Sequence, residues 1–323
     1  MPLYPWKLKA PLKDYIWGGT RLRDEYGKET GLEKIAESWE LSAHKDGQSV
    51  VENGSLRGLS LEAAIEKEGW HRILGAHGSR ASNFPLLIKF IDAHDNLSVQ
   101  VHPDDAYAFK HEGEYGKTEM WYIIDADEDA ELIYGFSREI TREECRKRIE
   151  NNTLLEVVNH VKVRPGDVAF IPAGTLHAIG KGILLAEVQQ SSNSTYRVYD
   201  YGRVGKDGKP RPLHIDKALD VLRFEPPAQP VTKGRPLECF AEIEVTELVR
   251  CDLFEAFTID LHGRAHMNAG SKGFQSLLML TGSMELSWGG GEAYVEKGDS
   301  YFLPAGFGDY YVRGEGRFLL SRV

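Results

Sequence analysis

The stretch VRPGDVAFIPAGTLHAIGK, from Val163 to Lys181, decides the fold of this chain. It reads G-x(5)-P-x-G-x(2)-H, with Gly166, Pro172, Gly174 and His177 at the fixed places. The first glycine and the aspartate after it predict a tight turn between two strands. Pro172 and Gly174 end the second strand, because proline gives no ladder donor and glycine tolerates positive φ. The pattern predicts a hairpin that presents His177 from the start of the next strand.

A second copy of this pattern lies near the end of the chain. The stretch VEKGDSYFLPAG, residues 295–306, overlays VRPGDVAFIPAG, residues 163–174, and seven residues recur at one constant offset. A repeat this far apart indicates two copies of one domain rather than a solenoid. The copies differ where His177 is expected, since the corresponding residue is Asp309. We therefore predict a metal-bearing first domain and a metal-free second one.

The other candidate metal ligands lie upstream of the first copy. Gln100 and His102, in LSVQVHPD, are two residues apart, so in a strand they face the same side. Glu119 follows in GKTEMWY at the head of another predicted strand. Together with His177 these residues could converge inside one small barrel. Two imidazoles, one carboxylate and one amide oxygen suit Zn²⁺ with an open position, or another borderline divalent metal.

Several motifs in this order resemble a known family. The hairpin pattern resembles the second sequence motif of the cupin barrels, whose histidine is a metal ligand. The motifs IWGGTRL, ESWELSAH, SVQVHPDD, GKTEMWY, IPAGTLHAIG and EVQQSSNSTYRVYDYGR together resemble the short bacterial form of the type I mannose-6-phosphate isomerases, and the resemblance spans most of the chain. It implies that zinc is bound by Gln100, His102, Glu119 and His177, and that Arg197 is an active-site residue. The first motif is Q-x-H instead of the general cupin H-x-H, a departure which that family shares.

We expect an all-β fold of two cupin-type jelly-roll barrels with a few short helices, the second barrel being degenerate. The expected boundaries are 1–225 for the catalytic half, with N-terminal strands and helical insertions, 226–236 for a proline-rich linker and 237–323 for the second barrel. Helices are predicted over residues 60–74, 141–149 and 214–222. Ser60 is the predicted N-cap of the first helix, and Thr141 with Glu144 forms a predicted capping box in the second.

Composition narrows the class of protein. The 323 residues suggest about two domains, and 41% hydrophobic and 27% charged residues are ordinary for a globular protein. The net charge of −10 argues against a nucleic-acid partner. Neither a secretion signal nor an apolar run long enough for a bilayer is visible. Three scattered cysteines without metal spacing indicate reduced thiols and a cytoplasmic location. The oligomeric state is left open.

The resemblance implies the interconversion of mannose 6-phosphate and fructose 6-phosphate, a step of mannose and general carbohydrate metabolism. Aldose–ketose isomerisation needs a base, an electrophile for the enediolate oxygen and a phosphate anchor. Zinc can act as Lewis acid or as template. Arg197 can stabilise developing negative charge or bind the phosphate. Glu187 is the favoured base, because it precedes Arg197 in the same motif at an inward-facing position, and a partly dry pocket could raise its pKa toward neutrality. Lys117 is the rival as proton shuttle.

An acidic chain that binds an anionic sugar phosphate needs a local cationic pocket. Lys89 is the most informative candidate, because it is enclosed by apolar residues in PLLIKFI and must point toward a polar interior or cavity. Lys117 and Arg197 are further candidates. Ser98 is a candidate hydroxyl donor, and Trp17, from the IWGGTRL motif, is a further candidate for substrate binding.

Two other functions remain open from the sequence. Two histidines and one carboxylate also form the facial triad of Fe(II) oxygenases, although Gln100 as an additional ligand counts against it because oxygen chemistry needs open positions. A non-catalytic, sugar-phosphate-binding cupin is the other possibility. The presence of Glu187, Lys117 and Arg197 beside the metal set argues against that function. The breadth of sugar-phosphate specificity, the metal bound in the cell and the role of the second barrel are not determined by the sequence.

Overall fold

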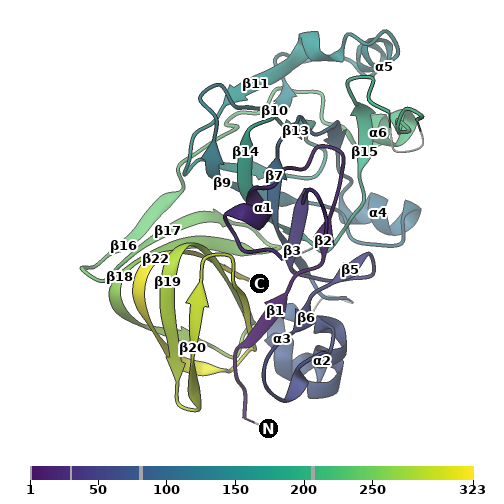
Figure 1. Ribbon diagram of the computed structural model, residues 1–323. Helices are drawn as coiled ribbons and strands as arrows, with labels where there is room; N and C mark the ends of the chain where they lie inside the picture. The colour runs from purple at the N-terminus through teal and green to yellow at the C-terminus, as the bar shows by residue number, and fades with distance from the viewer. Residues whose placement is uncertain (1, 30, 80–82, 205–207) are drawn as a thin grey trace.

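Two antiparallel β-barrels lie side by side in the computed structural model, which describes residues 2–29, 31–79, 83–204 and 208–323 (Figure 1). Strands outweigh helices throughout, and each barrel encloses an apolar core of its own. The predicted all-β, two-barrel fold of cupin type is therefore confirmed. No helix within the described ranges combines the length and the apolar composition needed to cross a bilayer.

The first barrel consists of two sheets. The five-stranded sheet has the order β11 (Val158–Lys162), β10 (Glu131–Phe136), β13 (His177–Ile179), β8 (Val99–Val101) and β15 (Tyr196–Tyr199). The six-stranded sheet has the order β12 (Val168–Ile171), β9 (Glu119–Ala126), β14 (Ile183–Gln190), β7 (Leu86–Ala93), β3 (Glu37–Leu41) and β2 (Leu12–Lys13). Buried side chains from both sheets, among them Trp121, Leu132 and Ile179, form one cluster inside the barrel. Inward-facing polar residues of these strands therefore share one enclosed space.

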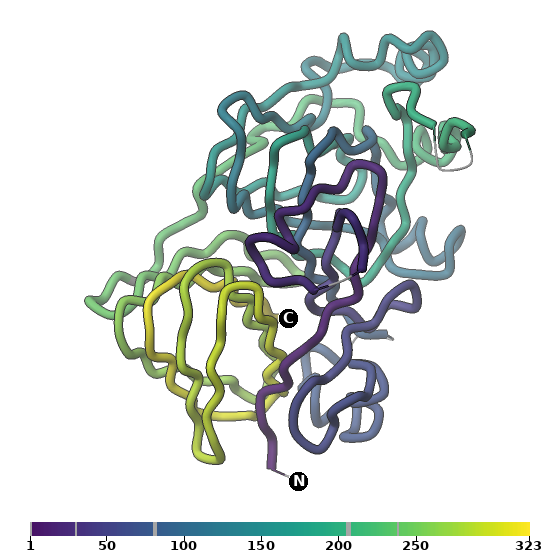
Figure 2. Tube along the Cα trace, in the orientation of Figure 1, coloured from purple at the N-terminus to yellow at the C-terminus, as the bar shows by residue number. Residues whose placement is uncertain are grey.

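The second barrel is closed by one larger sheet. Its strands follow the order β16 (Arg235–Cys239), β17 (Ile243–Arg250), β18 (Glu255–Ala269), β22 (Gly308–Arg322), β19 (Gln275–Trp288), β21 (Ser300–Leu303), β1 (Trp6–Lys9) and β6 (Val50–Val51), and β20 (Gly291–Glu296) pairs with β19. A short hairpin of β4 (Ala43–His44) and β5 (Gly47–Gln48) stands apart from the large sheets. The first strand, β1, lies in this sheet, and Figure 2 shows it as the purple segment beside the yellow barrel. The domain boundaries given above stay a prediction. Strand β1, which belongs to the expected first half, pairs with β21 in the sheet of the second barrel.

The two copies of the hairpin pattern have the same local geometry. Asp167 accepts a hydrogen bond from the backbone N–H three residues earlier at 2.7 Å, and the adjoining Gly166 has φ of 84°. Asp299 does the same at 3.1 Å, and Gly298 has φ of 92°. A left-handed glycine beside an aspartate that binds its own turn explains why the Gly-Asp pair recurs. The predicted strand after the turn and the start of the next strand at His177 are both confirmed.

Short helices cover the outside of the barrels. The helices are α1 (Arg21–Asp24), α2 (Leu61–Glu68), α3 (Trp70–Gly78), α4 (Asp105–His111), α5 (Arg142–Glu150) and α6 (Ile215–Val221), with 3-10 turns η1 (Gly54–Leu56) and η2 (Leu154–Val157). Buried residues of α5 and α6 share an apolar cluster with β8, β10 and β13, on the outer face of the five-stranded sheet (Figure 1). The first barrel is therefore covered by helices on its five-stranded sheet and by the second barrel on its six-stranded sheet.

Two of the three predicted helices agree with α5 and α6 to within one residue at each end. The Oγ1 of Thr141 accepts from the N–H of Glu144 at 3.1 Å, which confirms the cap. The prediction of one helix over residues 60–74 is wrong in its continuity. Gly69, at φ of 97°, separates α2 from α3, and α3 continues to Gly78. Ser60 caps α2 as predicted, accepting from Ala63 N–H at 3.3 Å.

The two barrels are joined through a common apolar core. Buried residues from the outer face of the six-stranded sheet, from α2 and α3 and from the second barrel form one cluster, which includes Phe90, Phe274 and Phe302. Polar contacts add to it, since the Nη1 of Arg317 donates to the hydroxyl of Tyr122 at 2.7 Å. Tyr122 lies on β9, the strand that also carries Glu119, so the second barrel supports a strand of the site.

Candidate metal centre and active site

Strand register brings the four predicted metal ligands together. β13 pairs with β8 so that His177 lies opposite Gln100, and β12 pairs with β9 so that Ile171 lies opposite Glu119. His102 follows the end of β8 and is buried. The Nε2 atoms of His102 and His177 are 3.1 Å apart, and Nε2 of His177 lies 3.3 Å from Glu119 Oε1. The carboxamide nitrogen of Gln100 lies 3.4 Å from Nε2 of His177, so its amide is beside the cluster.

Backbone carbonyls orient both imidazole rings. The Nδ1–H of His102 donates to Ser194 O at 2.8 Å, and the Nδ1–H of His177 donates to Thr175 O at 2.9 Å. Burial, with the nearby charge of Lys117, lowers the pKa of both rings, that of His177 to about 3. The rings are therefore neutral, and each Nε2 lone pair faces the other. The Nζ of Lys117 lies 3.1 Å from Nε2 of His102 and donates to it. Neutral imidazoles whose Nδ1–H groups are held by backbone carbonyls and whose Nε2 atoms converge are the usual arrangement of metal-ligating histidines.

Glu119 completes the cluster. Its side chain is fully buried, and its Oε1 has no hydrogen-bond donor among the described residues. Burial raises the pKa of Glu119 to about 7, against the lowering effect of the adjacent Lys117 ammonium, which donates to Oε2. One ligand atom each from His102, Glu119 and His177 lies within 4.8 Å of the others. An unpaired buried carboxylate oxygen is costly, so the donor set fits a bound divalent cation.

Glu187 is held beside this cluster by two lysines and a tryptophan. The Nε1–H of Trp121 donates to Oε2 of Glu187 at 3.0 Å, and Nζ of Lys89 lies 3.2 Å from Oε1. Nζ of Lys117 lies 3.7 Å from the same oxygen. Burial alone would raise the pKa of Glu187, but the charges of Lys117 and Lys89 lower it to about 2. The expectation of a pKa raised toward neutrality is therefore wrong, because two ammonium groups outweigh the loss of solvent.

A pocket of about 250 Å³ lies next to the cluster, with Gln100 and Lys117, which contact the cluster, in its wall. The predicted substrate-binding and catalytic residues lie on its wall, namely Trp17, Lys89, Ser98, Lys117, Glu187 and Arg197, together with Gln100. Residues that the sequence did not single out also line it: Tyr15, Glu37, Asn193, Thr195 and Arg211. Glu37 is the first residue of the ESWELSAH motif, and this motif could have identified it from the sequence. Four cationic and two acidic side chains line the wall, as an anionic substrate requires in a chain of net charge −10.

Arg197 differs from the other cations of the pocket. Its Nη1 donates to Pro212 O at 3.1 Å, while its buried Nε has no acceptor among the described residues. Burial, followed by the charge of Arg211, lowers the pKa of Arg197. Arg211 is itself paired with Asp200 at 2.5 Å. Arg197 is thus a partly desolvated cation with a free donor beside the pocket, which suits it to bind an anion.

The second barrel lacks such a cluster in the described residues. Asp309, at the place of the histidine, has 67% of its side chain exposed, whereas His177 is fully buried. Asp309 accepts from His266 at 3.0 Å and from Asn268 at 2.8 Å on the barrel surface. The adjoining Tyr310 is fully buried in the apolar core of this barrel and donates to Gln275 Oε1 at 2.9 Å.

We predict that Asp309→Ala leaves metal content and turnover unchanged. The replaced carboxylate is exposed and holds only two exposed neighbours, and such substitutions change stability by less than about 0.5 kcal/mol. Metal analysis and the isomerase assay on the same preparation measure both quantities. Loss of a metal in this variant would place a ligand in the second barrel and contradict the prediction.

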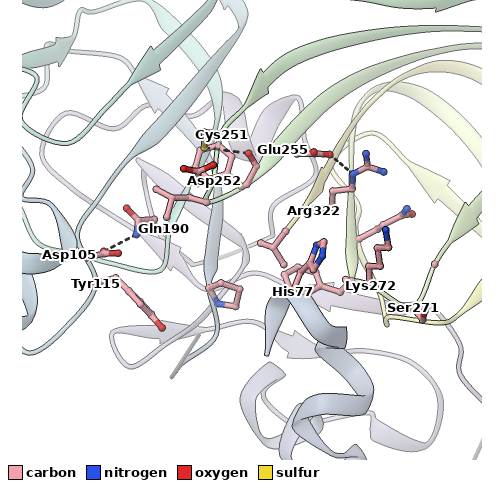
Figure 3. Close-up of a pocket in the computed structure, with 18 of the residues that line it drawn as sticks. His77, Asp105, Tyr115, Gln190, Cys251, Asp252, Glu255, Ser271, Lys272 and Arg322 are labelled. Carbon is pink, nitrogen blue, oxygen red and sulfur yellow. Dashed lines mark hydrogen bonds and ion pairs between the residues drawn. The ribbon is translucent and has the colours of Figure 1, made fainter. Parts of the chain in front are cut away.

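A second hollow, a groove of about 890 Å³ between the two barrels (Figure 3), is lined by other residues than the cluster. Its wall carries Asp105 and Gln190 from the first barrel and Asp252, Glu255, Lys272 and Arg322 from the second. Glu255 is paired with Arg322 at 2.6 Å, and Asp105 accepts from Gln190 at 2.9 Å. The carboxylates of Glu255 and Asp105 are thus engaged by partners within the wall of the groove.

The fold and the enclosed His–Glu–His cluster define a two-barrel cupin with a candidate metal centre. A family described as phosphomannose isomerase type I, catalytic domain, matches residues 6–137, and one described as mannose-6-phosphate isomerase, cupin domain, matches residues 244–323. The chain is 40% identical to the mannose-6-phosphate isomerase of Streptococcus mutans over 98% of both chains, and 40% identical to mannose-6-phosphate isomerase ManA of Bacillus subtilis over the whole of both. The crystal structure of the mannose 6-phosphate isomerase from Bacillus subtilis superposes with a TM-score of 0.89 at 36% identity, over 99% of each chain. This chain belongs to the type I mannose-6-phosphate isomerase family, as its motifs predicted.

Proposed function

We propose that this protein interconverts mannose 6-phosphate and fructose 6-phosphate by moving a proton between C2 and C1 through an enediol. The observation that carries the proposal is the buried cluster of His102, Glu119 and His177, next to a pocket that is lined by Glu187 and by four cationic side chains. The names of the similar proteins from Streptococcus mutans and Bacillus subtilis, which are mannose-6-phosphate isomerases, support mannose 6-phosphate as a substrate.

Zinc is the proposed cofactor, one per chain, with His102, Glu119 and His177 as ligands and Gln100 as the fourth. Two neutral imidazoles and a carboxylate with one unpaired oxygen form a set that zinc binds well. When bound, such an ion supplies Lewis acidity toward the hydroxyl and carbonyl oxygens of a sugar. The protein's own part is to keep the rings neutral, oriented and closed to bulk water.

Glu187 is the proposed base. Its Oε2 accepts from Trp121, so the proposed proton acceptor is Oε1, which takes the C2 proton of the aldose and returns it to C1 while Lys89 and Lys117 lie beside it. The lowered pKa keeps this carboxyl ionised at neutral pH, in the form that accepts a proton. Lys117, whose Nζ lies 3.7 Å from that oxygen, is the alternative proton carrier. Both groups face the same space, so an exchange experiment is needed to assign the base.

Arg197 is the proposed contact for negative charge on the substrate. Lys89 and Lys117 already face Glu187, whereas Arg197 makes no ion pair with the described residues. Ser98 and Trp17 are the proposed neighbours of the sugar, and Lys89 is proposed to contact it while also holding Glu187. Whether Arg197 binds the phosphate or stabilises the transition state is decided by a kinetic test.

We predict that Arg197→Lys lowers kcat and kcat/KM together, on the order of 10- to 100-fold. A planar guanidinium makes two directed bonds which a single ammonium does not reproduce. An interaction made mainly in the transition state reduces both constants, whereas one made equally with substrate raises KM and leaves kcat unchanged. Steady-state kinetics with mannose 6-phosphate distinguish these patterns. A raised KM with unchanged kcat would assign Arg197 to ground-state phosphate binding.

The proposed function is tested by a coupled assay for fructose 6-phosphate formed from mannose 6-phosphate, before and after chelation and with zinc restored. Performing it without oxygen separates isomerisation from the Fe(II) oxygenase alternative. Tight binding of mannose 6-phosphate without turnover would favour the non-catalytic sugar-phosphate-binding cupin. The three cysteines form no disulfide in the described structure, and we propose the cytoplasm as the location.

A further inference from the structure

The ring of His102 depends on a backbone carbonyl that is itself held by a carboxylate. We propose that Glu114, a residue outside the site described so far, positions His102 through Ser194 and thereby sets the affinity of the metal centre. The inference rests on the proposed metal centre but not on the identity of the sugar phosphate.

The first link joins His102 to Ser194. The Nδ1–H of His102 donates to Ser194 O at 2.8 Å, and no side chain among the described residues shares this contact with the ring nitrogen. The bond determines which ring nitrogen carries the proton and directs Nε2 toward His177 and Glu119. A shift of the Ser194 carbonyl would therefore turn the ligating nitrogen away from the cluster.

The second link joins the segment of residues 192–194 to Glu114. Oε1 of Glu114 accepts from the hydroxyl of Ser194 at 2.5 Å, from the hydroxyl of Ser192 at 3.4 Å and from the backbone N–H of Asn193 at 3.4 Å. Three donors from three consecutive residues thus converge on one carboxylate oxygen. This segment belongs to no strand, so these bonds supply the order that a sheet would otherwise give.

The other oxygen of Glu114 is anchored from a different part of the chain. Nε2 of His44, on β4, lies 3.2 Å from Glu114 Oε2, and Lys45 lies 3.9 Å from it. The same hairpin binds the segment directly, because Asn193 donates to Asp46 at 2.8 Å. Burial would raise the pKa of Glu114, but the bonds from His44 and Ser194 lower it to about 2. Glu114 is thus an ionised bridge between the β4–β5 hairpin and the segment.

The segment links metal geometry to the substrate pocket. Asn193 and Thr195 line the pocket, and β15, which carries Arg197, begins at Tyr196. A displacement of residues 192–194 would move one wall of the pocket together with the ring of His102. Glu114 therefore acts as a positioning residue for two parts of the site, although it touches neither metal ligand nor substrate.

The test is zinc affinity, measured by competition with a chromogenic chelator in the absence of any sugar. Glu114→Ala is expected to weaken zinc binding about 10- to 100-fold, as is usual when a group that orients a metal ligand is removed. Glu114→Gln keeps an acceptor oxygen for Ser194, so its zinc affinity is expected to lie between that of the wild type and that of Glu114→Ala. The Co²⁺-loaded Glu114→Ala protein should also show a changed d–d absorption spectrum, which a mere loss of fold stability would not produce.

Glu144→Ala is the matched control. Glu144 also has its pKa lowered to about 2, and it bridges Arg138 and Arg148, but it lies on α5 outside the barrel. We expect unchanged zinc affinity in this variant. Ser194→Ala should weaken zinc binding in the direction of Glu114→Ala, and the double variant should be no weaker than Glu114→Ala alone, because both changes break the same link. Wild-type zinc affinity in folded Glu114→Ala, or fully additive effects, would overturn the proposal. Failure of the isomerase assay alone would refute the proposed substrate and leave this result unaffected.

Discussion

Replacing His102 or His177 by alanine is expected to remove both the bound metal and turnover. Each ring supplies one of the two imidazole nitrogens of the cluster, and with either lost only one imidazole, the buried carboxylate and the Gln100 amide remain. Purified wild-type protein should contain about one zinc per chain. We expect each variant to lose that zinc and to lower kcat at least ~10³-fold, since the chemistry depends on the ion's Lewis acidity.

Metal analysis by mass spectrometry and the coupled assay on the same preparations measure this effect. His160→Ala is the control, because His160 is an exposed histidine on β11 that pairs with Glu131 at 2.6 Å. It should retain both zinc and activity. A metal-free preparation of the wild-type protein with full activity would refute the metal-dependent mechanism.

The predictable part of the fold comes from local rules that the structure obeys. The Gly-Asp turn needs a left-handed glycine, and both copies of the pattern have one, at Gly166 and Gly298. Hydrophobic periodicity did not reveal that Gly69 separates α2 from α3, because the apolar residues continue on both sides of it. The pairing of β1 with β21 is also absent from the sequence pattern, since a contact between residues near 8 and near 300 leaves no local trace.

In the site, too, some features could be predicted from local sequence and others could not. Gln100 and His102 could be placed together because their spacing in a strand puts them on one side, and the structure brings both beside His177. The environment of Glu187 could not be derived in this way. Its pKa depends on Lys89, which lies opposite it in the β14–β7 register, and β7 is buried at every position, so no alternation reveals that register. Arg211 comes from an irregular segment, for which sequence periodicity says nothing.

The charge of the buried Glu187 carboxylate is neutralised by nearby lysine side chains and not by solvent. Lys89 is 3.6 Å from Glu37 as well as 3.2 Å from Glu187, so one ammonium serves two carboxylates. A low pKa makes Glu187 a weak base in the resting protein, and a general base works best with a pKa near the working pH. The position of Lys89 and Lys117 relative to Oε1 thus controls how readily this carboxylate accepts a proton.

Glu187→Gln is expected to lower kcat by about 10³-fold, within the range usual for loss of a general base. The amide keeps the shape and can still accept from Trp121, but it cannot take a proton from carbon. Zinc content should be unchanged, because Glu187 is not among the cluster of ligand atoms. Thermal unfolding of the variant, compared with the wild type, controls for the loss of a partner of Lys89.

The decisive measurement is exchange of the substrate C2 proton with solvent in Glu187→Gln, followed by NMR in deuterated water. If Glu187 is the base, exchange falls in parallel with kcat, because no proton leaves C2 without it. Lys117→Met serves as the companion variant, since it removes the rival carrier and leaves the carboxylate in place. Exchange at the wild-type rate in Glu187→Gln would show that another group, most directly Lys117, takes the proton. Glu187 would then act only as the buried counterion that holds Lys89 and Lys117 at the pocket wall.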